Sequence, residues 1–466
     1  MQKTENKKID ILNGPVHQVL FAIAIPLMIN NVITSLYNLA DRLWLAQLSL
    51  VDFSATSFIW PPHFLFVSLG MGIAMAGISI ISQLIGAEEL EKARSYAAHV
   101  FYFSLGAGLF FSALAVFLAP NIIGWMGATG LLAERSITYF SIIMVGFFFE
   151  MLYLSFYAIL GAQGKTRVMT QISLITSVVN VVLDPLFIFD TVPLIGIKGL
   201  NMGIAGAAWA TVLSQFLRVV LGLGAIRSAD NEIQLQLIKV KLSGRKFREL
   251  VTVGFPTALG QSSAALGFTL MNSIVVSYGQ TTLAAYAAVN RVSGLLLQPV
   301  QGLGSAMTPI VGQNLGAEQG ERVKKFNKAA FKSVTIITVI SGVLLMLIRY
   351  PLLNLFIGEA GADAEQVWSL ALEYVYYLTA MLPVMGYFHV FSGIFVGAGY
   401  HRYAAFLSIM RLWGLRLPLV LIFQNFTSLG ATGIWISMLA SNALLVPLEL
   451  WLYWKEDWFR NPKISH

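Results

Sequence analysis

Long apolar stretches recur along the whole chain and constrain its fold more than any other feature. Spanning the hydrocarbon core of a bilayer takes about 20 apolar residues. Lipid-exposed backbone must satisfy its own hydrogen bonds, and strand-like alternation is not seen, so these stretches are expected to be helices. Only 11% of the 466 residues are charged, against roughly 25% in a soluble domain. We therefore predict an all-α polytopic membrane protein with twelve transmembrane helices. Their approximate bounds are 17–45, 53–81, 95–118, 136–160, 168–189, 203–226, 249–277, 284–312, 329–356, 367–396, 403–425 and 430–454.

Lysine and arginine are distributed unevenly between the predicted loops. The termini and the even-numbered loops hold twenty-one of these residues, whereas the odd-numbered loops hold only Arg42, Arg135 and Lys198. Because positively charged loops stay in the cytoplasm, we expect a multi-pass protein of the plasma (inner) membrane with both termini cytoplasmic. The net charge of +7 lies mostly in these short loops. It therefore predicts no nucleic-acid partner.

The second half of the chain resembles the first. The segment QLIGAE (83–88) recurs as QNLGAE (313–318), 230 positions later, and Pro26 recurs as Pro256 at the same offset. The matches fall at equivalent places in the topology, and the same loops face the cytoplasm in both halves. The sequence therefore predicts a parallel duplication, with two six-helix bundles related by a pseudo-twofold axis along the membrane normal.

The repeat divides the chain into five units. The basic segment between the halves is interpreted as a solvated linker, with contact to lipid headgroups as the alternative. A monomer in contact with membrane lipids is expected. The units are a cytoplasmic N-terminal tail (1–16), an N-lobe with helices one to six (17–226), a basic cytoplasmic linker (227–248), a C-lobe with helices seven to twelve (249–454) and a cytoplasmic C-terminal tail (455–466).

Two carboxylic acids lie inside predicted helices of the N-lobe, where an acid costs a few kcal/mol. Asp41 is far along the first helix and Asp184 is far along the fifth, so both lie beyond the membrane midplane at similar depth. Each acid ends a polar stripe with the spacing i, i+4, i+7, i+11, which is one face of a helix. Such faces are expected to meet protein or a water-filled cavity, with simple buried packing as the alternative. The stripes are Asn30, Thr34, Tyr37 and Asp41, and Ser173, Ser177, Asn180 and Asp184.

Burial and a neighbouring carboxylate both disfavour ionisation, so this acid pair is expected to bind and release a proton near neutral pH. Asn180, Tyr37 and backbone carbonyls would add oxygen ligands. The same site could therefore hold Na⁺ at Asp41, Asn180 and Asp184, and the residues do not choose between the two ions. No cysteine is present, which excludes thiolate metal sites. We expect no cofactor beyond the coupling ion, H⁺ or Na⁺.

Two prolines are expected to let these helices bend. Pro185 directly follows Asp184 and cannot donate a hydrogen bond to the carbonyl of Val181. Pro26 does the same to the carbonyl of Ala22 in the first helix.

These motifs together resemble the multidrug and toxic compound extrusion (MATE) family. They are AIPLMINN and YNLADRLWL in the first helix, the QLIGAE and QNLGAE loops, GAQGKTR after the fourth helix, and NVVLDPLF in the fifth. The resemblance covers nearly the whole chain. It implies an antiporter with a central cavity between two lobes. Such a protein exports small-molecule organic cations or amphipathic drugs in exchange for H⁺ or Na⁺.

The resemblance also implies roles for individual residues. Asp41, Asn180 and Asp184 match the coupling-site positions of the DinF-like branch, in which the first helix bends at the proline matching Pro26. The NorM-like branch carries further acids in helices seven and ten. Helix seven of this chain has none, so coupling is expected to be confined to the N-lobe.

Two other classes of function were weighed. A flippase for a lipid or lipid-linked oligosaccharide would want several cations facing its cavity, and the candidates are Arg291, Arg411 and Arg416. An intramembrane enzyme would need clustered acids or paired histidines, whereas the six histidines are scattered. The chain is therefore expected not to be an enzyme. Arg411 and Arg416 need buried partners, for which Glu150, Glu373 and Glu449 are candidates.

Overall fold

The described part of the chain forms an all-helical protein with twelve long helical segments, eleven of which meet the length and hydropathy of a membrane span. The computed structural model describes residues 9–193, 195–235, 240–357 and 364–455. Within these ranges the chain is helical apart from its connecting loops and one isolated bridge between Thr191 and Lys198. The first half contains α1 (Val16–Ala46), α2 (Leu50–Phe58), α3 (Trp60–Gly86), α4 (Leu90–Trp125), α5 (Gly130–Ala162), α6 (Thr166–Ile188) and α7 (Gly203–Ile226).

The second half repeats this arrangement. Its eleventh span contains a π-helical segment, η1, between two α-helical parts. The elements are α8 (Gly244–Ser277), α9 (Gln280–Gly316), α10 (Gly320–Ile357), α11 (Ala364–Gly397), α12 (His401–Ile409), η1 (Met410–Arg416), α13 (Leu417–Phe426) and α14 (Ala431–Lys455). Eleven segments in the described chain are long and apolar enough to cross a membrane. The twelfth is α9, which is as long but more polar.

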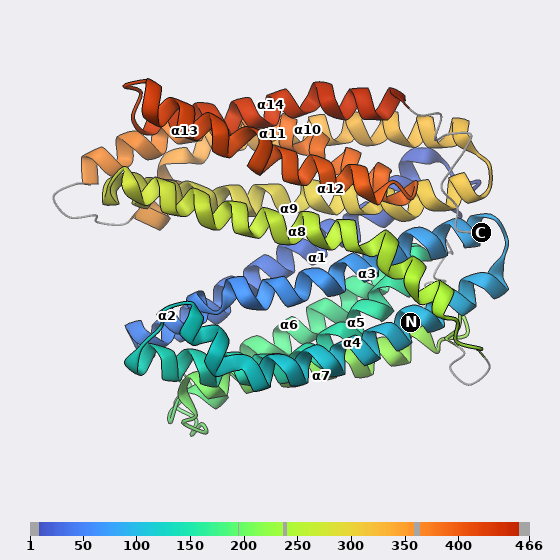
Figure 1. Ribbon diagram of the computed structural model, residues 1–466, viewed down its shortest axis with the longest axis horizontal. Helices are drawn as coiled ribbons and strands as arrows, with labels where there is room; N and C mark the ends of the chain where they lie inside the picture. Colours follow the sequence, from blue (N-terminus) through green and yellow to red (C-terminus); the bar gives the residue numbers. More distant parts are fainter. Residues whose placement is uncertain (1–8, 194, 236–239, 358–363, 456–466) are drawn as a thin grey trace.

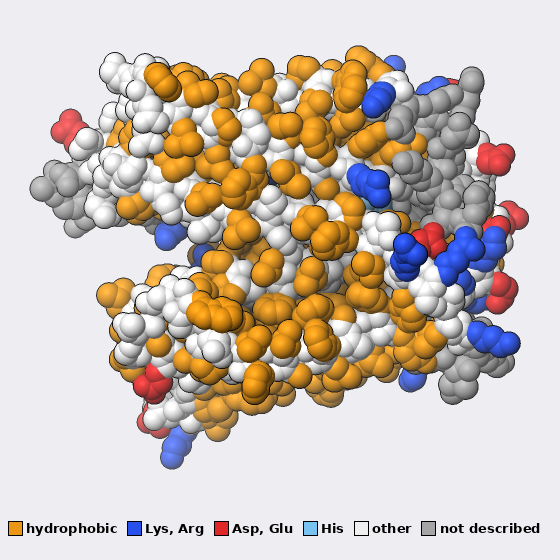
Figure 2. Space-filling model, in the orientation of Figure 1, with side chains coloured by type: hydrophobic (Ala, Val, Ile, Leu, Met, Phe, Trp, Pro, Cys, Tyr) orange, Lys and Arg blue, Asp and Glu red, His pale blue; other side chains and the backbone are white. Residues whose placement is uncertain are grey.

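The helices form two lobes that meet at one end and separate at the other. In Figure 1 the helices of the first half lie together below those of the second half. The lobes converge where loops 87–89, 163–165, 317–319 and 398–400 connect the helices. Lysine and arginine side chains gather at this end, which we call the basic end (Figure 2). At the opposite end Figure 2 shows a notch between the lobes, so the molecule is open on that side.

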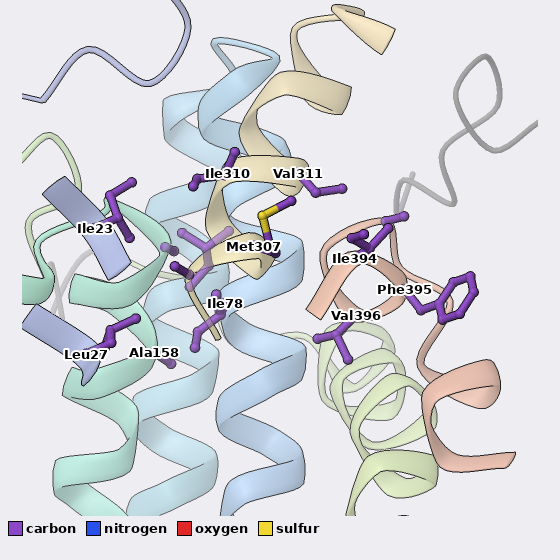
Figure 3. Packing of buried hydrophobic residues seen from close by; sticks show 14 of the residues in the cluster. Ile23, Leu27, Ile78, Ala158, Met307, Ile310, Val311, Ile394, Phe395 and Val396 are labelled. Carbon is purple, nitrogen blue, oxygen red and sulfur yellow. The ribbon is translucent and has the colours of Figure 1, made fainter. Parts of the chain in front are cut away.

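The hydrophobic core explains this shape. The largest cluster of buried apolar residues draws on both lobes, and Figure 3 shows α1, α3 and α5 facing α9 and α11 across it. Ile23, Ile78, Met307 and Ile394 are members of this cluster. Two further clusters each lie within one lobe. One surrounds Phe147 in the first lobe, and the other surrounds Trp435 in the second. The lobes therefore share a core near the basic end and have separate cores towards the open end.

The interface between the lobes repeats the pseudo-symmetry of the sequence. The hydroxyl groups of Ser68 on α3 and Ser262 on α8 are hydrogen-bonded to each other. At the related position, Asn31 on α1 donates to the carbonyl of Gln298 on α9 at 3.3 Å. Polar contacts thus cross the interface at two equivalent places, and each joins one helix of the N-lobe to one helix of the C-lobe.

The segments expected to be tails and a linker are partly packed where the structure describes them. In the predicted linker (227–248), Ile233 is fully buried, its backbone amide donates to Gln163 at 3.2 Å, and α8 already begins at Gly244. Residues 227–230 are exposed, so the linker packs locally at Ile233 and is solvated at its start. In the N-terminal tail, Ile11 is buried and its carbonyl accepts from Arg322 of α10 at 3.1 Å. The predicted C-terminal tail (455–466) lies outside the described residues apart from its first residue, which ends α14.

Candidate functional site

The two predicted acids meet inside the N-lobe. Asp184 on α6 is fully buried, Asp41 on α1 is partly buried, and their carboxyl groups lie close together. Helices α1 and α6 pack against each other and bring the two groups together. Two ionised carboxylates this close repel each other, and a proton on one of them removes the repulsion. The pair is therefore suited to hold one proton between two acids.

Asn180 lies one helical turn before Asp184 and orients its carboxyl group. With its amide turned to give each atom a complementary partner, Asn180 donates to Asp184 Oδ2 at 3.0 Å and accepts from the backbone amide of Thr211 at 3.3 Å. The Oδ1 atoms of Asp41 and Asp184 are both buried and have no hydrogen-bond partner among the described residues. These two oxygens are therefore available to bind a proton or a cation.

The oxygen atoms present also fit a small hard cation. Such ions take carboxylate, amide and carbonyl oxygens. Each acid has one unpartnered oxygen, and the Asp184 carboxyl group lies beside the amide of Asn180. Across the described part of the chain, no three acidic or histidine side chains are grouped in the manner of a transition-metal site. Asp41, Asp184 and Asn180 would hold Na⁺ if it were bound.

Tyr37 and an arginine complete the polar surroundings of the acids. Tyr37 interacts electrostatically with both acids and with Arg218, and it is hydrogen-bonded to the side chain of Thr211. Arg218 on α7 donates from Nε to Thr176 at 3.3 Å. A cation thus lies within the same lobe as the acid pair. The Arg218 guanidinium also lies 5.1 Å from the ring centroid of Tyr153, so the side chain points into the lobe.

The two polar stripes do not remain equivalent along their length. Ser173 and Ser177 on α6 are buried within the lobe, and the hydroxyl of Ser177 has no partner among the described residues. On α1, Thr34 is exposed and donates to the carbonyl of Asn30 in its own helix at 2.9 Å. The stripes therefore meet at their acidic ends, while their other ends face different surroundings.

Pro26 lies deep within α1, and α6 holds the backbone around it. The hydroxyl of Thr166 donates to the carbonyl of Ile23 at 3.0 Å, and that of Thr170 donates to the carbonyl of Pro26 at 2.7 Å. Pro185 has a different place, since α6 ends only three residues later at Ile188. A hinge in the middle of a helix is therefore available at Pro26, whereas Pro185 lies in a final turn.

Replacing Thr170 with valine is expected to loosen α1 at Pro26. The change keeps the shape of the side chain and removes a hydrogen bond that contributes about 1 kcal/mol. Hydrogen exchange measured by mass spectrometry should become faster in α1 around Pro26 and stay unchanged in α3. Thr252→Val is the control, because Thr252 is exposed and donates only within its own helix. Unchanged exchange in α1 would contradict this role.

The two arginines of the eleventh span are buried in the C-lobe, and Arg411 has one of the expected acids, Glu449, as an electrostatic neighbour. Arg416 donates from Nε to Ser441 at 3.2 Å, and the Arg411 guanidinium lies 4.1 Å from the ring centroid of Phe388. Neither forms an ion pair with an acid within the described ranges. Of the acids proposed as partners, Glu150 approaches His63 at 3.8 Å and Glu373 accepts from Thr432 at 2.7 Å. Glu449 is fully buried and interacts electrostatically with Arg411 without forming a direct ion pair.

Three residues of the acid site could not be selected from the sequence. Tyr139 on α5 is buried and interacts electrostatically with both acids. The backbone amide of Thr211 donates to Asn180, and Arg218 faces the same lobe. The sequence marks Arg218 as unusual, because a charged residue within an apolar span needs a polar partner. Nothing in the sequence marks Tyr139 or Thr211, since tyrosine and threonine are ordinary residues of apolar helices.

Two lobes of membrane helices, a cleft that opens at one end only, and a buried carboxyl pair within one lobe are the features of a polytopic membrane transporter. Residues 26–186 and 256–422 match the model of the MatE family, so the match covers both lobes. The chain belongs to this family, as its motifs indicated, and it is a transporter and not an enzyme.

Relatives of known name agree with this assignment. The probable multidrug resistance protein YoeA of Bacillus subtilis is 23% identical over 442 residues, which are 93% of this chain and 92% of the relative. The probable multidrug resistance protein NorM of Thermotoga maritima is 24% identical and covers 95% and 93% of the two chains. The multidrug export protein MepA of Staphylococcus aureus is 22% identical and covers 95% of each.

The fold has close structural counterparts. A solved structure described as the outward-facing conformation of a multidrug resistance MATE family transporter superposes with a TM-score of 0.89 at 24% identity, over 96% of this chain and 98% of the other. A transporter from Pyrococcus furiosus superposes equally well. These comparisons confirm the predicted architecture of two helical lobes.

Proposed function

We propose that this chain exports cationic or amphipathic organic compounds in exchange for H⁺ or Na⁺. The observation that carries the proposal is the buried carboxyl pair of Asp41 and Asp184 within one lobe of a two-lobed transporter. A carboxyl group inside a membrane protein marks an ion pathway more often than a packing site. The names of the MatE relatives supply the substrate class, since several are called multidrug resistance or export proteins.

We propose that ion and substrate are coupled because each favours a different state of the same conformational equilibrium. An ion bound between Asp41 and Asp184 neutralises one of the two negative charges, and its release leaves two carboxylates that need new partners. Asn180 and Tyr37 would change their hydrogen bonds with that charge. Because Thr170 joins the acid-bearing helix α6 to α1 beside Pro26, a change at the acids can reach the hinge of α1.

The orientation follows from the loop charges. We propose that the basic end faces the cytoplasm, with the protein in the plasma membrane as a monomer and both termini cytoplasmic. The described conformation is then closed towards the cytoplasm and open towards the outside. This is the state that takes up the ion and releases the exported compound. A cycle of alternating access needs a second state, opened at the basic end.

The alternative function is a flippase for lipids or lipid-linked oligosaccharides. That reading needs cations in the central cavity to receive an anionic headgroup. Arg411 and Arg416 are only 6% and 2% exposed, and they lie inside the C-lobe. These two arginines therefore do not line an open path for a headgroup, and antiport is the better-supported function.

Transport by the purified chain in proteoliposomes tests this proposal. A fluorescent organic cation should move against its gradient when a pH gradient or a Na⁺ gradient is imposed, and the gradient that drives it identifies the coupling ion. Fluorescent lipid added to the same vesicles should stay in its leaflet. Export that follows neither gradient would overturn the antiporter, and lipid scrambling without cation export would establish the flippase.

A further inference from the structure

The repeated QLIGAE and QNLGAE segments build two equivalent helix ends. They close α3 and α9 with the same backbone conformation, because Glu88 and Glu318 both adopt positive φ angles, of 59° and 57°. The residue after each donates five positions back, from Glu89 to Leu84 at 2.9 Å and from Gln319 to Asn314 at 2.8 Å. The proposed ion site does not use these segments.

The glutamine that begins each segment reaches across to the other lobe. Gln83 on α3 of the N-lobe donates from Nε2 to the carbonyl of Gly397, the last residue of α11, at 2.9 Å. Gln313 on α9 of the C-lobe donates from Nε2 to the carbonyl of Ala162, the last residue of α5, at 2.7 Å. Carbonyls at the end of a helix lack a partner within it. Each glutamine therefore caps a helix that belongs to the opposite lobe.

The helix ends also touch closely enough that both glutamines are shielded from water. A side chain at Gly86 would overlap the carbonyl of Gln313, and one at Gly316 would overlap the carbonyl of Gln83. Gln83 and Gln313 are 2% and 6% exposed. Buried amides must be hydrogen-bonded, and the carbonyl of the opposite lobe is within reach only while the basic end is closed. Within its own lobe Gln83 has the hydroxyl of Ser79, at 3.4 Å. Opening that end would expose amides and carbonyls to water, which can replace the lost bonds.

We propose that Gln83 and Gln313 form a symmetric pair of cross-lobe bonds that sets the equilibrium between the described conformation and one opened at the basic end. These are positioning residues, because they act on the lobes and not on the ion. Neutral amide bonds suit this task, since each shifts an equilibrium by about fivefold and is replaced by water at little cost. A buried ion pair would leave charges exposed and hold the lobes more firmly.

Cysteine accessibility tests the proposal in the full chain, which has no cysteine of its own. Ser82→Cys provides the reporter, because Ser82 on α3 is fully buried and faces Gly312 of α9 across the interface. The protein is placed in lipid nanodiscs, and its labelling by a water-soluble maleimide is timed. Gln83→Met and Gln313→Met remove the donor at similar volume. Each should speed labelling about fivefold, and the double variant should approach the product of the two factors.

Gln163→Met is the matched control, because Gln163 lies at the same end and bonds only to Ile159 and Ile233 on its own side. A merely structural role would lower thermal stability in all three variants alike and leave labelling unchanged. Labelling at the parent rate in Gln83→Met and Gln313→Met would overturn the proposal, and so would an effect of only one of them. This inference rests on the proposed transport cycle. Because labelling requires no transport, the labelling experiment can fail while the transport experiment succeeds, and the reverse.

Discussion

Replacing Asp184 with asparagine is expected to reduce ion-driven export by about tenfold or more, while the protein still folds. The substitution keeps the volume and the contact with Asn180, and it removes the group that binds and releases the ion. A hydrogen bond to a charged group contributes about 1.5–3 kcal/mol. Asparagine carries no charge, so this contribution is lost in the ionised state and the ion no longer drives export. Initial rates in proteoliposomes under the driving gradient measure the effect. Asp41→Asn should act in the same direction.

The matched control for this experiment is Asp190→Asn. Asp190 follows α6 by two residues and is exposed, and its backbone carbonyl, rather than its carboxyl group, accepts from Gly199. It lies at the same end of the N-lobe but outside the buried pair, so export should be unchanged. Export by Asp184→Asn at the rate of Asp190→Asn, from protein of equal thermal stability, would show that the acid pair is a packing feature.

Replacing Gly86 with leucine is expected to produce the largest loss of stability. The new side chain would overlap the backbone carbonyl of Gln313, which cannot move as a flexible side chain can. Overpacking usually costs about 1–3 kcal/mol, and contact with backbone places this site at the upper end of that range or beyond it. The thermal midpoint in detergent should fall by several degrees, with export lost in the same preparation.

Gly106→Leu makes the same substitution where there is space. Gly106 lies on α4, and a Cβ there would meet no atom within 4 Å. Its midpoint should equal or exceed that of the parent, because glycine is unfavourable within a helix. If Gly86→Leu and Gly106→Leu melt together, then the ends of α3 and α9 do not require the close contact that the structure shows between them.

Sequence reasoning placed the two acids correctly for a simple reason. Depth in the membrane is set by helix rise, about 1.5 Å per residue, and the start of each helix is marked by polar loop residues. Asp41 and Asp184 therefore fall at one depth from counting alone. Which groups surround them depends on how α5 and α7 rotate against α1 and α6. That rotation is fixed by packing, so Tyr139, Thr211 and Arg218 were found only in the structure.

The contacts of the two arginines in the eleventh span also depend on packing. Their sequence neighbourhood shows that Arg411 and Arg416 need partners, and acids are the obvious candidates. The direct contacts are the ring of Phe388 and the hydroxyl of Ser441, while the buried Glu449 acts on Arg411 only electrostatically. An aromatic face or a hydroxyl can receive a guanidinium, but such groups are too common in an apolar chain to be singled out beforehand.

The sequence by itself determined the twelve spans, their division into two repeated lobes and the pair of acids in the first lobe. Each of these follows from local quantities, namely apolar length, loop charge and helix rise. The angle between the lobes, the closure of the basic end and the partners of Gln83 and Gln313 were decided by tertiary structure alone. The glutamines were visible as a repeated motif, yet their acceptors are the ends of α11 and α5, distant in the chain. Only the packing of one lobe on the other brings those carbonyls within reach.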